Sequence, residues 1–270
     1  MKRFIFEALC LALCFFGLFT LLSRVNYLGR FGGQKLGRNA EEKMGNLLYD
    51  FLRKQEKEVS QPAVTAALDT LLLHLTMAPD TGATPIRLHL FHSTTVNAFA
   101  LPGQQIVVTT EMIRFCKCPE ELAGVLAHEQ AHIVLNHVTE RVVKEIGVSL
   151  LSTLVSGRSD NQILGEIVHL LAGTAFDRKQ ERQADSAAVQ TLMTAGVDPE
   201  PFANLLFRLT HETPSVPEQF EWISTHPETK ERVSAILGWK KSSGNKSRPL
   251  LTPEAWDALK RSDAAGASNL

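Results

Sequence analysis

The spacing of apolar residues changes several times along this chain, and each change marks a different predicted element. From Phe4 to Leu22 nearly every residue is apolar, with Glu7 as the exception. A stretch of this length approaches the roughly 20 residues that a helix needs to cross a bilayer. We therefore predict that residues 1–24 form an N-terminal membrane anchor. A cleaved signal peptide is the alternative, but its apolar region is usually shorter and ends in small residues, unlike the segment before Arg24.

The next part of the chain passes from a linker to helices and then to strands. Residues 25–39 are rich in glycine and basic side chains and are expected to form a flexible linker. Apolar residues then recur with helical spacing over 40–58 and again after Pro62. Over residues 85–110 apolar and polar residues alternate around a Pro-Gly turn, which predicts a small antiparallel sheet.

Helical spacing resumes after this sheet and defines the rest of the domain. We expect one domain over 40–240, of fold class α+β, mainly helical with the small antiparallel sheet. Its apolar segments Ile146–Val155 and Ile163–Phe176 are too short to cross a bilayer. A helical hairpin in the core is favoured for them over insertion into the membrane interface. Residues 241–270 are expected to hold a linker, a short helix capped by Thr252 and a disordered tail.

Charge and cysteine content exclude some classes of function. The 28 basic and 29 acidic side chains give a formal net charge of −1, so there is no basic field and no nucleic-acid partner is expected. The four cysteines are too few for a disulfide framework. Cys116 and Cys118 form a C-x-C pair that can bind metal or act in redox chemistry. Two ordinary cysteines at a helix entrance are favoured, because no second pair completes a zinc site.

The segment Ala127-His128-Glu129-Gln130-Ala131-His132 fits the pattern H-E-x-x-H. Residues four apart on a helix lie about 40° from one another, so His128 and His132 leave the helix on one side and can share one tetrahedral ion. Glu129 projects about 60° from His132, where it can act as general base toward a water without binding the ion. Two surface histidines on an amphipathic helix are the alternative, which the context of the motif disfavours.

A hydrolytic zinc site needs a third protein ligand and an open position. Glu181 and Asp185 follow about 50 residues later, four apart on a predicted helix. Glu181 is the candidate third ligand rather than an exposed helix acid, and Asp185 is the candidate acceptor for the far nitrogen of a ligating histidine. Two imidazoles and one carboxylate without a thiolate predict one Zn²⁺ per chain, which Mn or Co can replace. His137 lies about 140° from His132 on a continuous helix and is not expected to bind the same ion.

These motifs and their order resemble peptidase family M48, the group that contains the Ste24, HtpX and Oma-type membrane proteases. The matching segments are Asn97–Gly103, Pro119–Glu129, Glu181-x-x-Ala184-Asp185, and Ser224–Pro227 with Arg232. The resemblance implies a gluzincin-like metalloprotease domain with a catalytic core over residues 85–238. Because only one membrane span is predicted, the chain is most similar to the single-anchor periplasmic or Oma-type branch.

The resemblance also implies roles for residues outside the metal-binding motifs. His226 is expected near the metal, either as a donor to the transition state or as a regulatory plug, and Arg232 is expected to steady the same region. An edge strand beside the active cleft is expected to bind substrate through Asn97, Ala98, Phe99 and Ala100.

Together these features predict a zinc metalloendopeptidase that hydrolyses extended or misfolded polypeptides. Binding through backbone hydrogen bonds favours unfolded segments over one sequence, and the resemblance implies quality control of envelope or membrane proteins. The expected location is a single-pass membrane protein with its catalytic domain on the periplasmic side of the inner membrane. Two other hypotheses stay open. One is a chaperone-like module whose peptidase is latent because His226 takes the open position, and the other is a structural zinc site with four protein ligands.

Overall fold

A computed structural model describes residues 37–76, 85–147, 161–211, 220–227, 230–240 and 249–262. None of the helices in these ranges combines the length and the apolarity that crossing a membrane requires. The predicted anchor over residues 1–24 and most of the predicted linker over 25–39 lie outside the described residues. So do residues 241–248 and 263–270, which cover the predicted C-terminal linker and the end of the tail.

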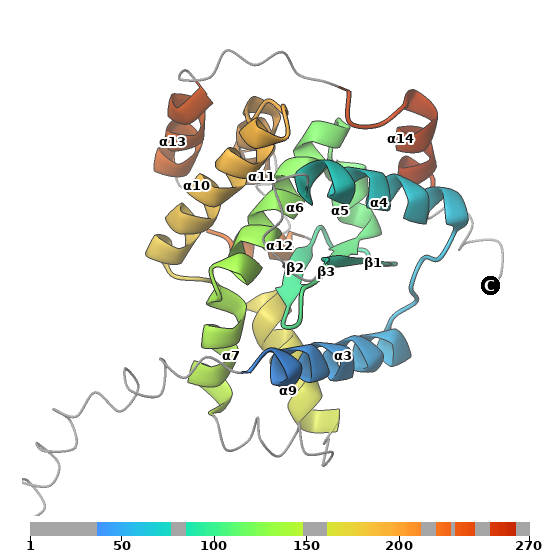
Figure 1. Cartoon of the computed structure of the whole chain (residues 1–270), viewed down its shortest axis with the longest axis vertical. Helices are drawn as coiled ribbons and strands as arrows, with labels where there is room; N and C mark the ends of the chain where they lie inside the picture. The colour runs from blue at the N-terminus through green and yellow to red at the C-terminus, as the bar shows by residue number, and fades with distance from the viewer. Residues whose placement is uncertain are drawn as a thin grey trace, which may run out of the picture.

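The elements follow one another in the order that Figure 1 labels. They are α3 (Arg38–Gln55), α4 (Pro62–Thr76), β1 (Arg87–Phe91), β2 (Ala98–Leu101), β3 (Gln105–Thr109), α5 (Thr110–Phe115), α6 (Pro119–Val134), α7 (His137–Ile146), α9 (Asn161–Gly173), α10 (Arg178–Thr194), α11 (Glu200–His211), α12 (Glu221–Thr225), α13 (Lys230–Lys240) and α14 (Pro253–Lys260).

The small predicted sheet is present, but it is mixed rather than antiparallel throughout. Its strand order is β1-β3-β2, with β2 antiparallel to β3 and β1 parallel to β3. The β2–β3 hairpin turns through Gly103 and Gln104, which have φ angles of 74° and 61°. A close turn of this kind is visible in the sequence. The sequence does not show which strand pairs with β1, because packing rather than the local pattern settles the order of strands in a sheet.

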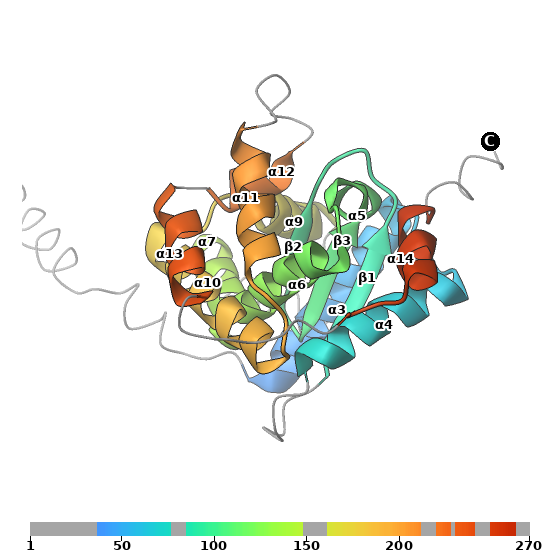
Figure 2. The ribbon, with the colours of Figure 1, turned by 90° about the horizontal axis from the view of Figure 1, so that it is seen from above.

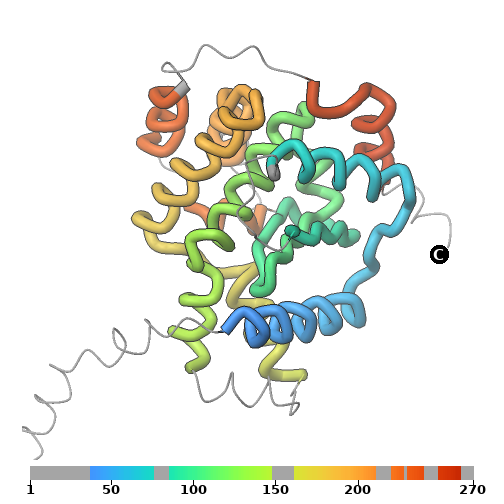
Figure 3. The backbone as a smooth tube through the Cα atoms, viewed as in Figure 1, coloured from blue at the N-terminus to red at the C-terminus, as the bar shows by residue number. Residues whose placement is uncertain are grey.

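Helices cover both faces of the sheet, and the side chains of the strands divide between two apolar clusters. In Figure 1, α3 and α9 lie on one side of the strands, and α4 and α6 lie on the other. The tube in Figure 3 shows how α3, near the start of the chain, comes to lie beside α9, with which it is in contact. Leu90, Ile106 and Val108 pack with the α4–α6 side, whereas Phe91 and Val107 pack with the α3–α9 side. The period of two along a strand produces this division.

Helix α6 runs through the centre of the domain and carries the H-E-x-x-H motif. Pro119 is its first residue, as predicted, and its missing N–H group costs nothing at that position. The helix packs against α11, where Phe202 lies directly over Gly124. After Val134 the chain turns through Asn136, whose φ of 65° is left-handed, and α7 begins. His137 therefore stands on a new helix, and the predicted angle of 140° on one continuous helix does not apply.

Helix α10 starts with a capping box that fixes its first turn. The Asp177 carboxylate accepts hydrogen bonds from the backbone N–H groups of Lys179 and Gln180, both at 2.8 Å. The Gln180 side chain accepts one in return from the Asp177 N–H group. Such a box stabilises a helix start by about 1 kcal/mol. Because α10 packs along α6, this start sets the position of Glu181 relative to the two motif histidines.

The predicted helical hairpin is described only in part. Helix α9 covers most of the second apolar segment and buries Leu164, Ile167 and Leu171 in the core, in contact with α7. Residues 148–155 of the first segment lie outside the described residues.

The C-terminal helix and the C-x-C pair have structural positions. Thr252 caps α14 through its side chain, as predicted, and Figure 2 shows α14 beside α4. Cys116 and Cys118 are free thiols, and burial raises the pKa of both. A redox-active or metal-binding cysteine needs a lowered pKa, so the structure favours ordinary cysteines.

Candidate metal centre

Four buried side chains from three parts of the chain meet at one point. His128 and His132 come from α6, Glu181 from the first turn of α10 and His226 from the residue that ends α12. One ligand atom from each lies within 4.8 Å of the others. The Nε2 atoms of His128 and His132 are 3.1 Å apart, and Glu181 Oε1 is 3.5 Å from His132 Nε2. The fold therefore brings the H-E-x-x-H helix together with the two distant segments that carry Glu181 and His226.

Glu129 faces the same cluster with one oxygen engaged and one free. Its Oε1 accepts a hydrogen bond of 2.9 Å from the indole Nε1 of Trp222 and lies 3.3 Å from His226 Nε2. Its Oε2 is buried and has no hydrogen-bond partner among the described residues. A buried acceptor without a partner is costly, and its retention beside the histidines fits a group that accepts a proton.

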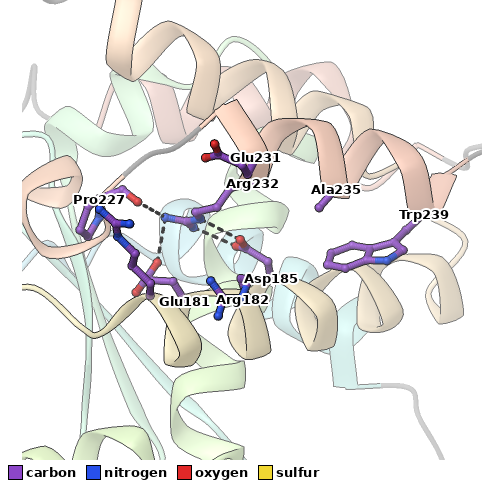
Figure 4. Close-up of a pocket in the computed structure, with 9 residues that line it drawn as sticks. Glu181, Arg182, Asp185, Pro227, Glu231, Arg232, Ala235 and Trp239 are labelled. Atoms are coloured by element: carbon purple, nitrogen blue, oxygen red, sulfur yellow. Dashed lines mark hydrogen bonds and ion pairs between the residues drawn. The ribbon is translucent and has the colours of Figure 1, made fainter.

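A second layer of charged groups holds the ligands in place. His128 Nδ1 lies 3.1 Å from Asp185 Oδ1, the contact expected of Asp185. Figure 4 shows Arg232 reaching Asp185 and Glu181 from α13. Its Nε and Nη2 atoms bond both oxygens of Asp185 at 2.7 and 2.8 Å, and its Nη1 lies 2.8 Å from Glu181 Oε2. Nη1 also donates to the carbonyl oxygens of His226 and Pro227, so Arg232 ties the α12 end to α10.

Burial and the surrounding charges act in opposite directions on this cluster. Burial alone would lower the pKa of His128, but hydrogen bonds with Asp185 and Glu181 outweigh it and raise the pKa to about 9. Burial prevails at His132 and lowers its pKa well below the usual value. Burial would raise the pKa of Glu181, but the charge of His226 and hydrogen bonds from all three histidines hold it well below its usual range. Glu181 is therefore an anion that faces the imidazoles.

The donor set fits one zinc ion. Neutral imidazoles and carboxylates without a thiolate are the ligands of hydrolytic zinc sites. When the imidazoles are neutral, as metal ligands are, the buried carboxyl groups of Glu129, Glu181 and Asp185 carry three formal negative charges, against one positive charge on Arg232, which contacts two of them. A divalent cation balances this difference, whereas the proton that His128 holds in the metal-free site offsets only part of it.

Two aromatic residues next to the cluster were not predicted, and the contact of His137 was not foreseen. The Phe176 ring stacks on His132 with 4.0 Å between ring centroids and lies 5.5 Å from the His226 ring. Trp222 holds Glu129 as described above and stands four residues before His226. His137 Nδ1 lies 3.1 Å from His132 Nδ1, so it orients this histidine from the side opposite the cluster. The sequence spacing of Phe176 and Trp222 does not identify them as site residues, because both come near the histidines only through tertiary packing.

The segment proposed to bind substrate occupies the sheet edge. Strand β2 is the last strand of the order β1-β3-β2. The side chains of Asn97, Ala98, Phe99 and Ala100 are buried. The amide nitrogen of Asn97 donates to Glu221 Oε2 at 2.7 Å and to the Ala172 carbonyl oxygen. This strand is thereby linked to α12, which leads to His226.

A buried H-E-x-x-H pair joined by a carboxylate from a second helix defines the site class of the zinc metalloproteases. Residues 62–240, more than half of the chain, match the profile of peptidase family M48. The chain belongs to this family.

Individual relatives match over most or about half of this chain. It is 26% identical over 247 residues to the Beta-barrel assembly-enhancing protease of Yersinia pestis, covering 86% of this chain and 49% of that protein. The protein of the same name from Escherichia coli K12 is 24% identical over 243 residues, covering 85% and 49%. The Mitochondrial metalloendopeptidase OMA1 of Schizosaccharomyces pombe is 32% identical over 156 residues, covering 56% and 46%. The chain thus spans about half the length of the curated relatives it matches.

Proposed function

We propose that this chain is a zinc metalloendopeptidase that hydrolyses peptide bonds in extended or misfolded polypeptides. The observation that carries the proposal is the convergence of His128, His132 and Glu181 beside the free oxygen of Glu129. Zinc, when bound, supplies a Lewis acid that lowers the pKa of water and polarises a carbonyl group. In this site His128, His132 and Glu181 would hold it.

The roles of the other residues follow from their contacts. Trp222 fixes Glu129 Oε1, so Glu129 Oε2 is the atom that takes a proton from water and passes it to the leaving amine. Asp185 and Arg232 hold His128 and Glu181 in position. His226 is the candidate donor to the oxygen that becomes negative in the transition state. An extended substrate would pair with the β2 edge at Asn97–Ala100 through backbone hydrogen bonds.

We further propose a role in quality control of envelope or membrane proteins. Support comes from the relatives, whose names refer to β-barrel assembly and to mitochondria. An anchor over residues 1–24 would hold a domain over 40–240 at the periplasmic side of the inner membrane, and unfolded polypeptides would be its partners.

Cleavage of casein by full-length protein, measured together with its zinc content, tests the proposal. We expect wild type to cleave, Glu129→Gln to keep zinc but lose at least about 10²-fold in rate, and Glu181→Ala to lose zinc. Glu166→Gln on the exposed face of α9 is the matched control and should behave as wild type. Equal rates for wild type and Glu129→Gln would refute the protease proposal.

A second candidate function is a chaperone-like module whose peptidase is latent. It is favoured by the position of His226, whose Nδ1 lies 3.0 Å from Glu181 Oε1 and 3.1 Å from His128 Nε2. From there it can serve as a fourth ligand, which would close the open position that catalysis needs. Faster casein cleavage by His226→Ala would support latency, whereas slower cleavage would support the donor role.

A further inference from the structure

A cavity of about 590 Å³ lies one side chain away from the metal-binding cluster. It is formed by one face of α7, the end of α9 and the start of α10. Phe176 belongs to its wall and also stacks on His132, so this ring separates the cavity from the histidines. The backbone N–H group of Phe176 donates to the Thr225 carbonyl oxygen, which fixes the wall to the residue before His226. A group in this cavity would therefore lie one aromatic ring away from the metal-binding histidines.

Arg141 is a buried part of the cavity wall that the proposed chemistry does not use. Only 8% of its surface is exposed. Its Nη2 donates to the backbone carbonyl and hydroxyl oxygens of Thr174, and its guanidinium carbon lies 4.3 Å from the centroid of the Phe176 ring. Its Nη1 has no hydrogen-bond partner among the described residues. A buried donor of this kind is costly, so an acceptor that enters the cavity would be favourable at this nitrogen.

The charges around the cavity indicate which acceptor is suitable. Glu140, Glu145 and Asp177 contribute three carboxyl groups at the rim, against the single ammonium group of Lys144. Glu140 and Glu145 are exposed and make no hydrogen bond or ion pair within the described residues. With Arg141 counted as well, the lining carries a formal charge of −1, which disfavours a carboxylate on the ligand and favours a cation beside the exposed acids. The neutral oxygen of a peptide carbonyl can reach Arg141 without that penalty.

We propose that this cavity is a substrate subsite in which Arg141 binds a main-chain carbonyl oxygen and the carboxylates of Glu140 and Glu145 accept a basic side chain. The ligand class is an extended peptide that carries a lysine or arginine near the bond to be cleaved. Phe176 and Leu170 supply apolar surface for the aliphatic stem of such a side chain. The subsite rests on the proposed peptidase function, and it makes Arg141 a residue that positions the substrate.

Direct binding tests the subsite without relying on turnover. The probes are three fluorescein-labelled, unstructured peptides that differ only in one central residue: lysine, alanine or glutamate. Their affinities are measured by fluorescence anisotropy on full-length, zinc-loaded Glu129→Gln protein. We expect the lysine peptide to bind about two- to fivefold more tightly than the alanine peptide, and the glutamate peptide more weakly than both.

Two sets of additional substitutions separate the two contacts. Glu140→Gln with Glu145→Gln should abolish the difference among the peptides. Arg141→Leu should weaken all three by about tenfold, because every peptide has the carbonyl group. Arg141→Lys should also weaken the binding of all three peptides, since one ammonium group cannot reach both Thr174 and the substrate. Arg53→Gln, at an exposed arginine on α3, should leave binding unchanged.

The outcomes distinguish the subsite from the proposed function. Equal affinities of the three peptides would overturn the basic preference, and unchanged affinities in both Arg141 variants would overturn the carbonyl contact. Thermal unfolding of each variant identifies any variant that fails to fold. If the Arg141 variants fail to fold, the substitutions at exposed Glu140 and Glu145 still test the proposal. If wild type did not cleave casein while the binding differences persisted, the proposed function would be wrong and the cavity would remain a peptide-binding site that prefers basic side chains.

Discussion

Replacing Gly124 by alanine should destabilise the domain, although alanine is the better helix former. A Cβ atom at this position would lie 2.4 Å from Phe202 Cβ and 2.6 Å from its Cγ. Carbon atoms in contact prefer 3.5–4.0 Å, so α6 and α11 would have to separate by roughly 1 Å. Overpacking of this kind costs about 1–3 kcal/mol, and the helix propensity of alanine offsets up to about 1 kcal/mol. We expect the free energy of unfolding to fall by about 1–2 kcal/mol in total.

The assay is urea and thermal unfolding of the zinc-free protein, with Gly238→Ala as the matched control. Gly238 lies on an exposed face of α13, and a Cβ atom there meets nothing within 4 Å. The free energy of unfolding of this control should rise by about 0.5–1 kcal/mol, from helix propensity alone. At about 2–4 °C per kcal/mol for a domain of this size, the two variants should shift the melting temperature in opposite directions.

The same substitution should also weaken zinc retention, because the Phe202 ring lies 5.9 Å from that of His128. Gly124→Ala protein as stable as Gly238→Ala would show that the α6–α11 contact is softer than the distances imply. The close packing argument would then be refuted.

Two further predictions concern the charged groups around the cluster. Arg232→Ala should lower the unfolding free energy in urea by about 3–5 kcal/mol, because it removes the guanidinium partner that the buried carboxylates of Asp185 and Glu181 share. Arg182→Ala, at the exposed arginine drawn beside this group in Figure 4, should change the unfolding free energy little, and equal losses would contradict the reasoning. Zinc-free protein should lose stability as the pH rises from about 6.5 to about 9, because the raised pKa of His128 lets the folded state hold a proton that the unfolded chain releases. Unfolding midpoints that increase with pH over that interval would contradict this.

The sequence motif was sufficient for the core of the site because helix geometry is local. Any H-E-x-x-H segment that forms a helix places both imidazoles on one side, whatever surrounds it. The capping signals at Pro119 and Thr252 were equally local, and the structure confirms both. Local reasoning gave a wrong position for His137, because it assumed that one helix continues through Asn136.

Groups that reach the site from other elements were harder to predict. The four-residue spacing of Glu181 and Asp185 indicated these two residues in the sequence. The sequence did not indicate Trp222 or Phe176, because neither has a metal-binding side chain or a sequence spacing typical of a metal site. The Arg141 nitrogen that has no partner among the described residues is likewise a property of packing, since it depends on where Thr174 and Phe176 lie.

The sequence by itself therefore determined the helical character of the domain, the presence of a small sheet and the identity of the metal-binding side chains. The helices, the strands and the placement of both motif histidines on one side of a helix depend on interactions within a few residues, where the allowed backbone geometry leaves few choices. The tertiary structure decided that β1 pairs with β3 in parallel, that α10 carries Glu181 to α6, and that Phe176 separates a cavity from the histidines. These are contacts between distant segments, and they depend on how apolar faces pack together, which no local pattern specifies.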